Sequence, residues 1–163
     1  MIRGADRMVN RNAALPVVAA LADLVSTLPG PIVLDHFAHA EAEHGTGQPG
    51  FEGVVQLLRS GKALVKLSGP YQISKRPGYS DISAIARAYV DAAPHRIMWG
   101  SDWPHTGGAG RPADQPVDFV EPFRQEDDIR NLALLTEWVP DPALRRRILV
   151  ETPASLYGFP GAA

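Results

Sequence analysis

Short apolar runs that alternate with helical segments constrain the fold of this chain most. Three such runs lie at Ile32–Leu34, Ala63–Ser68 and Ile97–Trp99, and each is too short for a helix. Short, almost wholly apolar strands are typical of parallel sheets, whose two faces are both covered. The order of elements is helix, strand, helix, strand, helix, strand, helix. The sequence therefore predicts an α/β fold with a parallel sheet covered by helices.

Helical segments are expected at five places. Residues 13–28 carry apolar side chains at spacings of three and four, as one buried face requires: Leu15, Val18, Leu21, Leu24, Val25 and Leu28. Further helices are expected over residues 51–60, 82–92, 127–138 and 141–150. Pro and Gly lie at the boundaries between these segments. With 163 residues and no internal repeat, the chain is predicted to form a single domain over residues 1–163.

Polar residues stand at the end of each predicted strand. The first strand ends in Asp35–His36, Lys66 and Ser68 close the second, and Asp102 and His105 follow the third. Ligands of parallel α/β folds bind at the carboxyl ends of the strands. We therefore expect a functional site built from these three strand ends.

Asp102 is the leading candidate for a catalytic residue. It closely follows the predicted strand at 97–99, in the segment WGSDWPH, where a carboxylate has no use in packing. A turn-initiating Asp before Pro is the simpler alternative. As a functional group, Asp102 could accept a proton from an attacking water, or bind a divalent cation with His36 as a second ligand.

Five more residues are candidates for the same site. Paired with Asp102, His36 suits either metal binding or acid–base chemistry near neutral pH. Four residues are predicted to contact a substrate, with solvent exposure, loop packing or a backbone hydrogen bond as the structural alternatives: His39, Ser68, Tyr71 and His105. Lys66 either points toward the centre of the fold or packs its stem at a strand edge.

Composition excludes several other classes of function. A net charge of −2 indicates no nucleic-acid partner and no membrane surface, and no apolar run is long enough to span a bilayer. A cytoplasmic location is the default expectation, because the first residues lack the apolar core of a signal peptide. The absence of cysteine excludes disulfides and thiolate ligands within this sequence. One divalent metal such as zinc, or no metal, both remain open, because catalytic zinc normally takes three protein ligands.

Four segments carry a resemblance to a known family: Ile32–His36, Val65–Gly69, Met98–His105 and Thr152–Phe159. Together they resemble the C-terminal part of the amidohydrolase-related family, in the branch similar to 2-pyrone-4,6-dicarboxylate lactonase and sugar lactonases. The resemblance implies a partial (β/α)8 TIM-type barrel made of the last three or so βα units. It implies that Asp102 is the general base and that His36 polarises a lactone carbonyl or binds a metal.

The same resemblance bears on the substrate. The arginines that hold carboxylates in the dicarboxylate lactonase correspond here to His39 and Gln72, which favours a less anionic lactone. The leading function is therefore hydrolysis of a lactone or related cyclic ester by water that Asp102 activates. The alternatives are a catalytically inactive truncated fragment, and a decarboxylase or isomerase of the same superfamily.

The family's first βα units, with their His-x-His pair, have no counterpart in this sequence. Three parallel strands, with a remnant of another at Ile2–Gly4, would leave two open sheet edges and marginal stability. We expect a fragment or a mis-started reading frame first. A complementing N-terminal half and a homo-oligomer that closes the barrel are the other options.

Overall fold

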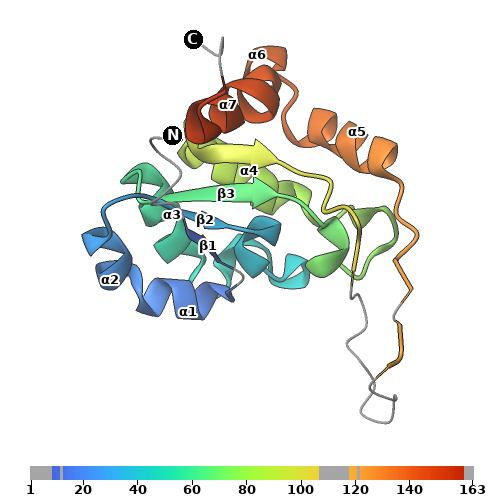
Figure 1. Cartoon of the computed structure of the whole chain (residues 1–163), viewed down its shortest axis with the longest axis horizontal. Coiled ribbons are helices and arrows are strands. Elements are labelled where there is room, and N and C mark those ends of the chain that lie inside the picture. Colours follow the sequence, from blue (N-terminus) through green and yellow to red (C-terminus); the bar gives the residue numbers. More distant parts are fainter. Residues whose placement is uncertain (1–8, 12, 107–117, 121, 160–163) are drawn as a thin grey trace.

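Four parallel strands form one sheet in the computed structural model of this chain, which describes residues 9–11, 13–106, 118–120 and 122–159. The strands are β1 (Val9–Arg11), β2 (Ile32–Leu34), β3 (Ala63–Leu67) and β4 (Ile97–Trp99), and they lie side by side in chain order (Figure 1). All three pairings are parallel, with Leu34 opposite Val65 and Lys66 opposite Met98. Because the strands run in one direction, their carboxyl ends meet at one edge of the sheet.

The parallel sheet and the three predicted strands are confirmed. The second strand ends at Leu67, one residue before the predicted end. Strand β1 was not predicted from the sequence, because Asn10 and Arg11 interrupt any apolar run there. The remnant expected at Ile2–Gly4 lies outside the described residues.

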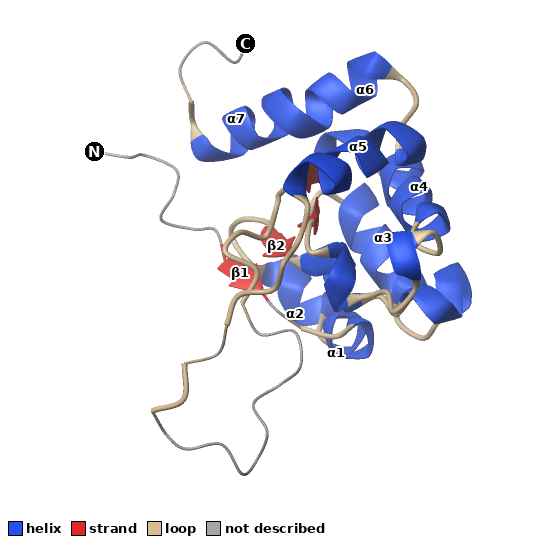
Figure 2. Cartoon of the chain, turned by 90° about the vertical axis from the view of Figure 1, so that its right-hand side faces the viewer, coloured by secondary structure: helices blue, strands red, loops and turns tan. Residues whose placement is uncertain are grey.

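Helices follow each strand along the chain, and most of them lie to one side of the strands in Figure 2. Their bounds are α1 (Leu15–Ala20), α2 (Ala22–Thr27), α3 (Phe51–Arg59), α4 (Ser83–Ala92), α5 (Asp128–Trp138), α6 (Pro142–Arg146) and α7 (Thr152–Tyr157). Shorter helical turns are η2 (His36–His39), η3 (Ala42–Gly47), η4 (Pro70–Gln72), η5 (Pro77–Tyr79), η6 (Pro94–Arg96) and the π-helical turn η7 (Arg147–Glu151). Helix α3 contacts both α1 and α4, α5 contacts α4, and η7 and α7 contact β4.

The single helix predicted over residues 13–28 is wrong in its continuity. It breaks at Leu21, whose backbone leaves helical geometry between α1 and α2. Leu21 and Leu24 of the predicted apolar face are 46% and 59% exposed, whereas Leu15, Val18 and Val25 are buried. The break divides the predicted apolar stripe into two short ones, Leu15 with Val18 before it and Val25 with Leu28 after it. The helix predicted at 141–150 is observed without a break, as α6 followed directly by the π-helical turn η7, because Arg146 and Arg147 keep helical backbone angles.

The two faces of the sheet differ in what covers them. Alternate residues of the strands face the large apolar core beneath the helices, as Ala63, Val65 and Leu67 of β3 do. The residues between them, Val33, Leu64 and Met98, form a separate small cluster against which Leu156 of α7 packs. Lys66 shares the face of Leu64, because side chains of a strand alternate between its faces. The face beneath the helices, called the helix face below, thus contains most of the core.

Within the described residues, no helix combines the length and the apolar character that crossing a bilayer would require.

Candidate functional site

The segment after β2 makes a left-handed turn. Four consecutive residues, His36 to His39, have φ between 49° and 55°, a region that residues other than glycine rarely occupy. Phe37 and Ala38 inside this turn are buried, and the Tyr89 hydroxyl donates a hydrogen bond to the Phe37 carbonyl at 3.3 Å. Surrounding packing therefore holds a costly backbone conformation, which is a common feature of functional sites. The turn places the imidazoles of His36 and His39 edge to face, with ring centroids 5.3 Å apart.

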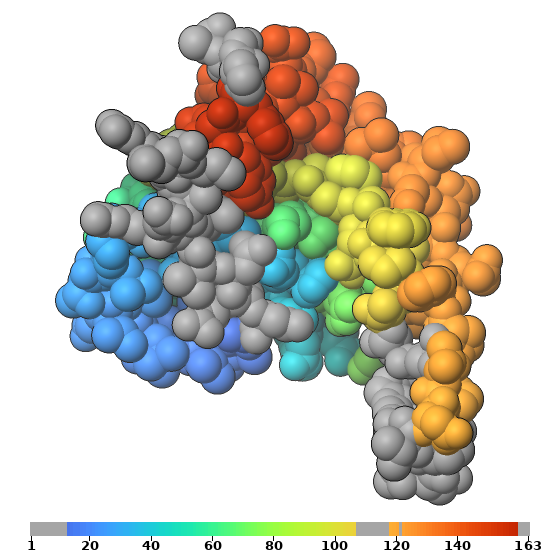
Figure 3. Space-filling view, in the orientation of Figure 1, coloured from blue at the N-terminus to red at the C-terminus, as the bar shows by residue number. Residues whose placement is uncertain are grey.

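Four of the predicted site residues converge where β2, β3 and β4 end. The Tyr71 hydroxyl donates a hydrogen bond to Asp102 Oδ2 at 2.6 Å, and His36 Nδ1 lies 3.7 Å from the same oxygen. Ser68 Oγ lies 3.3 Å from His36 Nδ1. In the space-filling view, the cyan, green and yellow segments that follow the three strands meet on one side of the molecule (Figure 3). The predicted convergence of strand-end residues is therefore observed.

Gly69 leaves the space into which this cluster fits. Its φ is +54°, and a Cβ built there would lie 2.6 Å from Asp102 Oδ2 and 3.1 Å from His36 Nδ1. Any other residue would strain the backbone and displace both side chains. Glycine is thus required at Gly69 by conformation and by space together.

An ion pair lies in the same hollow. Lys66 Nζ donates a hydrogen bond to Asp35 Oδ1, and both side chains are largely buried. The pair lines a hollow of about 450 Å³ together with His36, Ser68 and Asp102. Asp35 was not among the predicted site residues, although its place beside His36 at a strand end was the available signal. Lys66 turns its ammonium group toward the site, in line with the first of the two predicted orientations.

His39 lies beside this cluster and borders a neighbouring hollow. Burial lowers its pKa from the ordinary value, and the nearby His36 lowers it further. Its Nε2 is buried without a hydrogen-bond partner among the described residues. His39 is therefore kept neutral by its surroundings at physiological pH.

His105 is directed away from the hollow that His36 and Asp102 line. It is only 5% exposed, and its ring packs edge-on against Tyr71 at a centroid distance of 5.9 Å. Asp128 Oδ1 lies 3.2 Å from His105 Nε2, but the two atoms do not meet hydrogen-bond geometry. The backbone N–H of His105 donates to the Asp102 carbonyl at 2.8 Å, which is the turn contact expected for a structural histidine.

Tyr71 is kept protonated by its environment. Burial raises its pKa above the ordinary value, and its hydrogen bond to the Asp102 carboxylate raises it further. A neutral Tyr71 can only donate to a carboxylate, and it fills one of the acceptor sites of Asp102 Oδ2. Asp102 Oδ1 accepts no side-chain hydrogen bond within the described residues and is the less engaged of the two oxygens.

Within the described residues, His36 and Asp102 alone supply fewer donors than a catalytic zinc site takes. These residues supply two donor atoms, and Asp102 Oδ2 already accepts from Tyr71. Within the described ranges, the one group of three or more His, Asp or Glu donors close enough to share a metal is Glu41, Glu43 and His44. Catalytic zinc normally takes three protein ligands.

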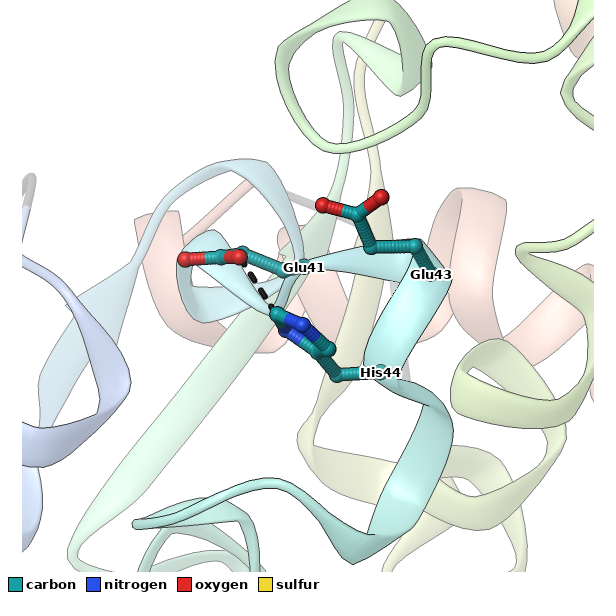
Figure 4. A group of neighbouring side chains, drawn as sticks. All are labelled: Glu41, Glu43 and His44. Carbon is teal, nitrogen blue, oxygen red and sulfur yellow. Dashed lines mark ion pairs between the residues drawn. The ribbon is translucent and has the colours of Figure 1, made fainter.

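The Glu41, Glu43 and His44 group is a surface cluster rather than a site (Figure 4). All three side chains are exposed. His44 Nδ1 lies 3.1 Å from a Glu41 carboxylate oxygen, and Lys75 Nζ lies 3.7 Å from Glu43. Ion pairs within the chain account for this arrangement.

The family model described as amidohydrolase matches residues 7–159. The chain belongs to the amidohydrolase family. The resemblance expected from the four sequence segments is thereby confirmed.

The curated relatives of this chain include enzymes that are named for lactones. The chain is 37% identical to 4-sulfomuconolactone hydrolase of Hydrogenophaga intermedia over 154 residues, which cover 94% of this chain and 47% of that protein. It is 32% identical to D-galactarolactone isomerase of Agrobacterium fabrum over 126 residues, which cover 77% of this chain and 39% of that protein. The chain thus spans at most about half the length of these curated relatives.

A solved structure supports the same relationship. The apo crystal structure of a protein from Agrobacterium tumefaciens superposes with a TM-score of 0.75 at 28% identity, covering 95% of this chain and 52% of that one. The α/β arrangement with a parallel sheet is therefore the one seen in about half of a larger related protein.

Proposed function

We propose that this chain carries the catalytic acid–base half of a hydrolase that opens a lactone or related cyclic ester. The observation that carries the proposal is the convergence of His36, Ser68, Tyr71 and Asp102 at the strand ends. A carboxylate, an imidazole and two hydroxyl groups around one hollow suit attack of water on an ester carbonyl. The named relatives that act on lactones support the substrate class.

In this mechanism Asp102 is the general base. Its Oδ1 accepts a proton from water while the water oxygen bonds to the lactone carbonyl carbon and the carbonyl oxygen becomes an oxyanion. The Tyr71 hydrogen bond holds Oδ2 and so aims Oδ1 at the water. Collapse of the tetrahedral intermediate then breaks the ring C–O bond, and the departing oxygen takes the proton back from Asp102. The product is a hydroxy acid.

His36 polarises the carbonyl in this proposal. Its Nδ1 lies near the Ser68 hydroxyl, which can donate a hydrogen bond to it. When Ser68 donates to Nδ1, the ring proton is on Nε2, the nitrogen that then donates to the carbonyl oxygen. His39 is proposed to contact substrate groups farther from the carbonyl, with Ser68 and Tyr71 nearer to it. The buried His105 lies outside the lining of this hollow, so the contact with substrate that the sequence suggested for it is not part of the proposal.

The barrel and the partners of this chain are also proposals. Four parallel strands and the likeness to half of a longer relative support a partial (β/α)8 barrel, whose remaining strands come from a complementing N-terminal half or a second copy. A less anionic lactone as substrate and a cytoplasmic location remain predictions.

The decisive test compares Asp102→Asn with Asp91→Asn in the complete, active form of the protein. Asp91 is exposed on α4, so its variant makes the same chemical change away from the site. Acid release from a panel of lactones, followed in a pH-stat, is expected to fall about 100-fold or more in Asp102→Asn and to stay unchanged in Asp91→Asn. Near-normal turnover of folded Asp102→Asn would remove Asp102 from its role.

An isomerase is the second candidate, because one relative is a D-galactarolactone isomerase. The same carboxylate could move a proton between substrate positions without net hydrolysis. Isomerisation releases no acid, so a lactone that is consumed without a pH-stat signal would favour this candidate.

A further inference from the structure

Tyr71 is held on three sides. Its hydroxyl donates to Asp102, its ring stands nearly perpendicular to that of His105, and the guanidinium carbon of Arg124 lies 4.6 Å from its ring centroid. A guanidinium over an aromatic face is attracted to the ring electrons. The ring that orients Asp102 is therefore itself fixed by a residue from another part of the chain.

Arg124 is in turn held in place by contacts of its own. Its Nε lies 3.3 Å from Glu126 Oε1, and the Tyr79 hydroxyl donates to Glu126 Oε2 at 2.8 Å. The backbone N–H of Arg124 donates to the His105 carbonyl at 3.1 Å. These contacts join the segment that precedes α5 to the turns η4 and η5, along the right-hand side of Figure 1.

The position of Arg124 separates it from the proposed reaction. Arg124 and Tyr71 line a hollow bounded by η5 and the start of α5, whereas His36 and Asp102 line the other. The ring of Tyr71 borders the first hollow and its hydroxyl reaches Asp102 at the second. Arg124 can therefore influence Asp102 through Tyr71.

We propose that Arg124 is a positioning residue that clamps the Tyr71 ring so that its hydroxyl stays on Asp102 Oδ2. The proposal rests on the proposed role of Asp102 as the base. Without the clamp, Tyr71 can leave Asp102, and the carboxylate can rotate and lose its aim at the water. Glu126 sets the direction of the guanidinium, since arginine has a planar fork of fixed geometry.

The first experiment observes Tyr71 directly, by NMR of the chain labelled with ¹³C at tyrosine Cζ. Four tyrosines are present, and Tyr71→Phe assigns the resonance of interest. Asp102→Ala removes the acceptor and defines the shift of an unbonded Tyr71. Arg124→Met is expected to move the same resonance toward that position. Arg130→Met is the matched control, because Arg130 borders the same hollow and lies beside Gly78.

Turnover gives the second readout. Arg124→Met is expected to lower kcat about 3- to 30-fold with KM unchanged. In the Tyr71→Phe background the same change should have no further effect, because the clamp acts through that ring. A merely structural role would instead give additive losses in both backgrounds.

The outcomes separate this inference from the proposed function. An unmoved Tyr71 resonance in Arg124→Met overturns the clamp, and so does an additive loss of kcat. A moved resonance in a chain with no lactone hydrolysis supports the clamp and defeats the hydrolase. Should Arg124→Met fail to fold, Arg124→Lys keeps the charge and loses the Nε contact with Glu126, and it must then shift the resonance by a smaller amount in the same direction.

Discussion

The two faces of the sheet differ in the side chains that they carry. The helix face packs the apolar side chains of Ile32, Val65 and Ile97 into one large core. The other face has a small apolar cluster and then the ion pair of Lys66 with Asp35, next to the hollow lined by His36 and Asp102. Neighbouring residues of one strand thus lie in different surroundings, because the pleat points successive side chains to opposite faces of the sheet. Four substitutions test how complete this division is.

The largest change in the free energy of unfolding is expected on the helix face. Leu58 of α3 is fully buried, so Leu58→Ala should lose about 2–5 kcal/mol from its cavity and lost contacts. The exposed Leu24 of α2 is the control, and Leu24→Ala should change stability by less than about 0.5 kcal/mol. Urea unfolding measures both. Equal losses in the two variants would contradict the assigned core.

The ion pair is expected to come next. Lys66→Met leaves the Asp35 carboxylate without its partner and should lose about 1–3 kcal/mol. Adding Asp35→Asn removes the stranded charge, so the double variant should recover part of the loss. The same urea titration checks this. If the two single losses simply add, the pair is not coupled and this face contributes nothing through it.

Gly69→Ala is expected to cost about 1–2 kcal/mol of stability from its left-handed backbone. Its main effect should be on the site, because the new methyl group would displace Asp102 and His36. Gly47→Ala is the control, since a Cβ at Gly47 meets nothing within 4 Å. A Tyr71 resonance that stays in place in Gly69→Ala would show that the cluster has more room than the geometry implies.

The smallest effect concerns pH. The pKa of His39 is lowered in the folded chain, so its neutral form contributes stability above the unfolded pKa of about 6.5. That contribution is lost as pH falls through this value toward the lowered folded pKa. His39→Gln should therefore flatten the fall in stability below about pH 6.5.

Much of the fold could be predicted from the sequence, because short apolar runs determine both strand position and burial. β2 and β4 begin and end where the apolar runs do. Strand β1 escaped notice, since pairing with β2 rather than apolar composition defines it. The break at Leu21 was also hidden, because helical spacing continues across it in the sequence.

The part of the candidate site that lies at the strand ends could also be predicted from the sequence. Strand ends of a parallel sheet must meet, so the convergence of His36, Ser68 and Asp102 followed from topology. Arg124 and Glu126 lie in a segment without periodicity, more than 50 and 45 residues from the tyrosines that they contact. No local pattern links them, and only the folded chain brings them together.

The left-handed turn at His36–His39 is also a place where a substitution can relieve backbone strain. Ala38 has φ of 55° and is buried, and its side chain is a single methyl group. Glycine would adopt this backbone conformation without strain, whereas alanine does not. Ala38→Gly would relieve the strain of the left-handed backbone, remove one buried methyl group and keep both histidines of the turn in the sequence.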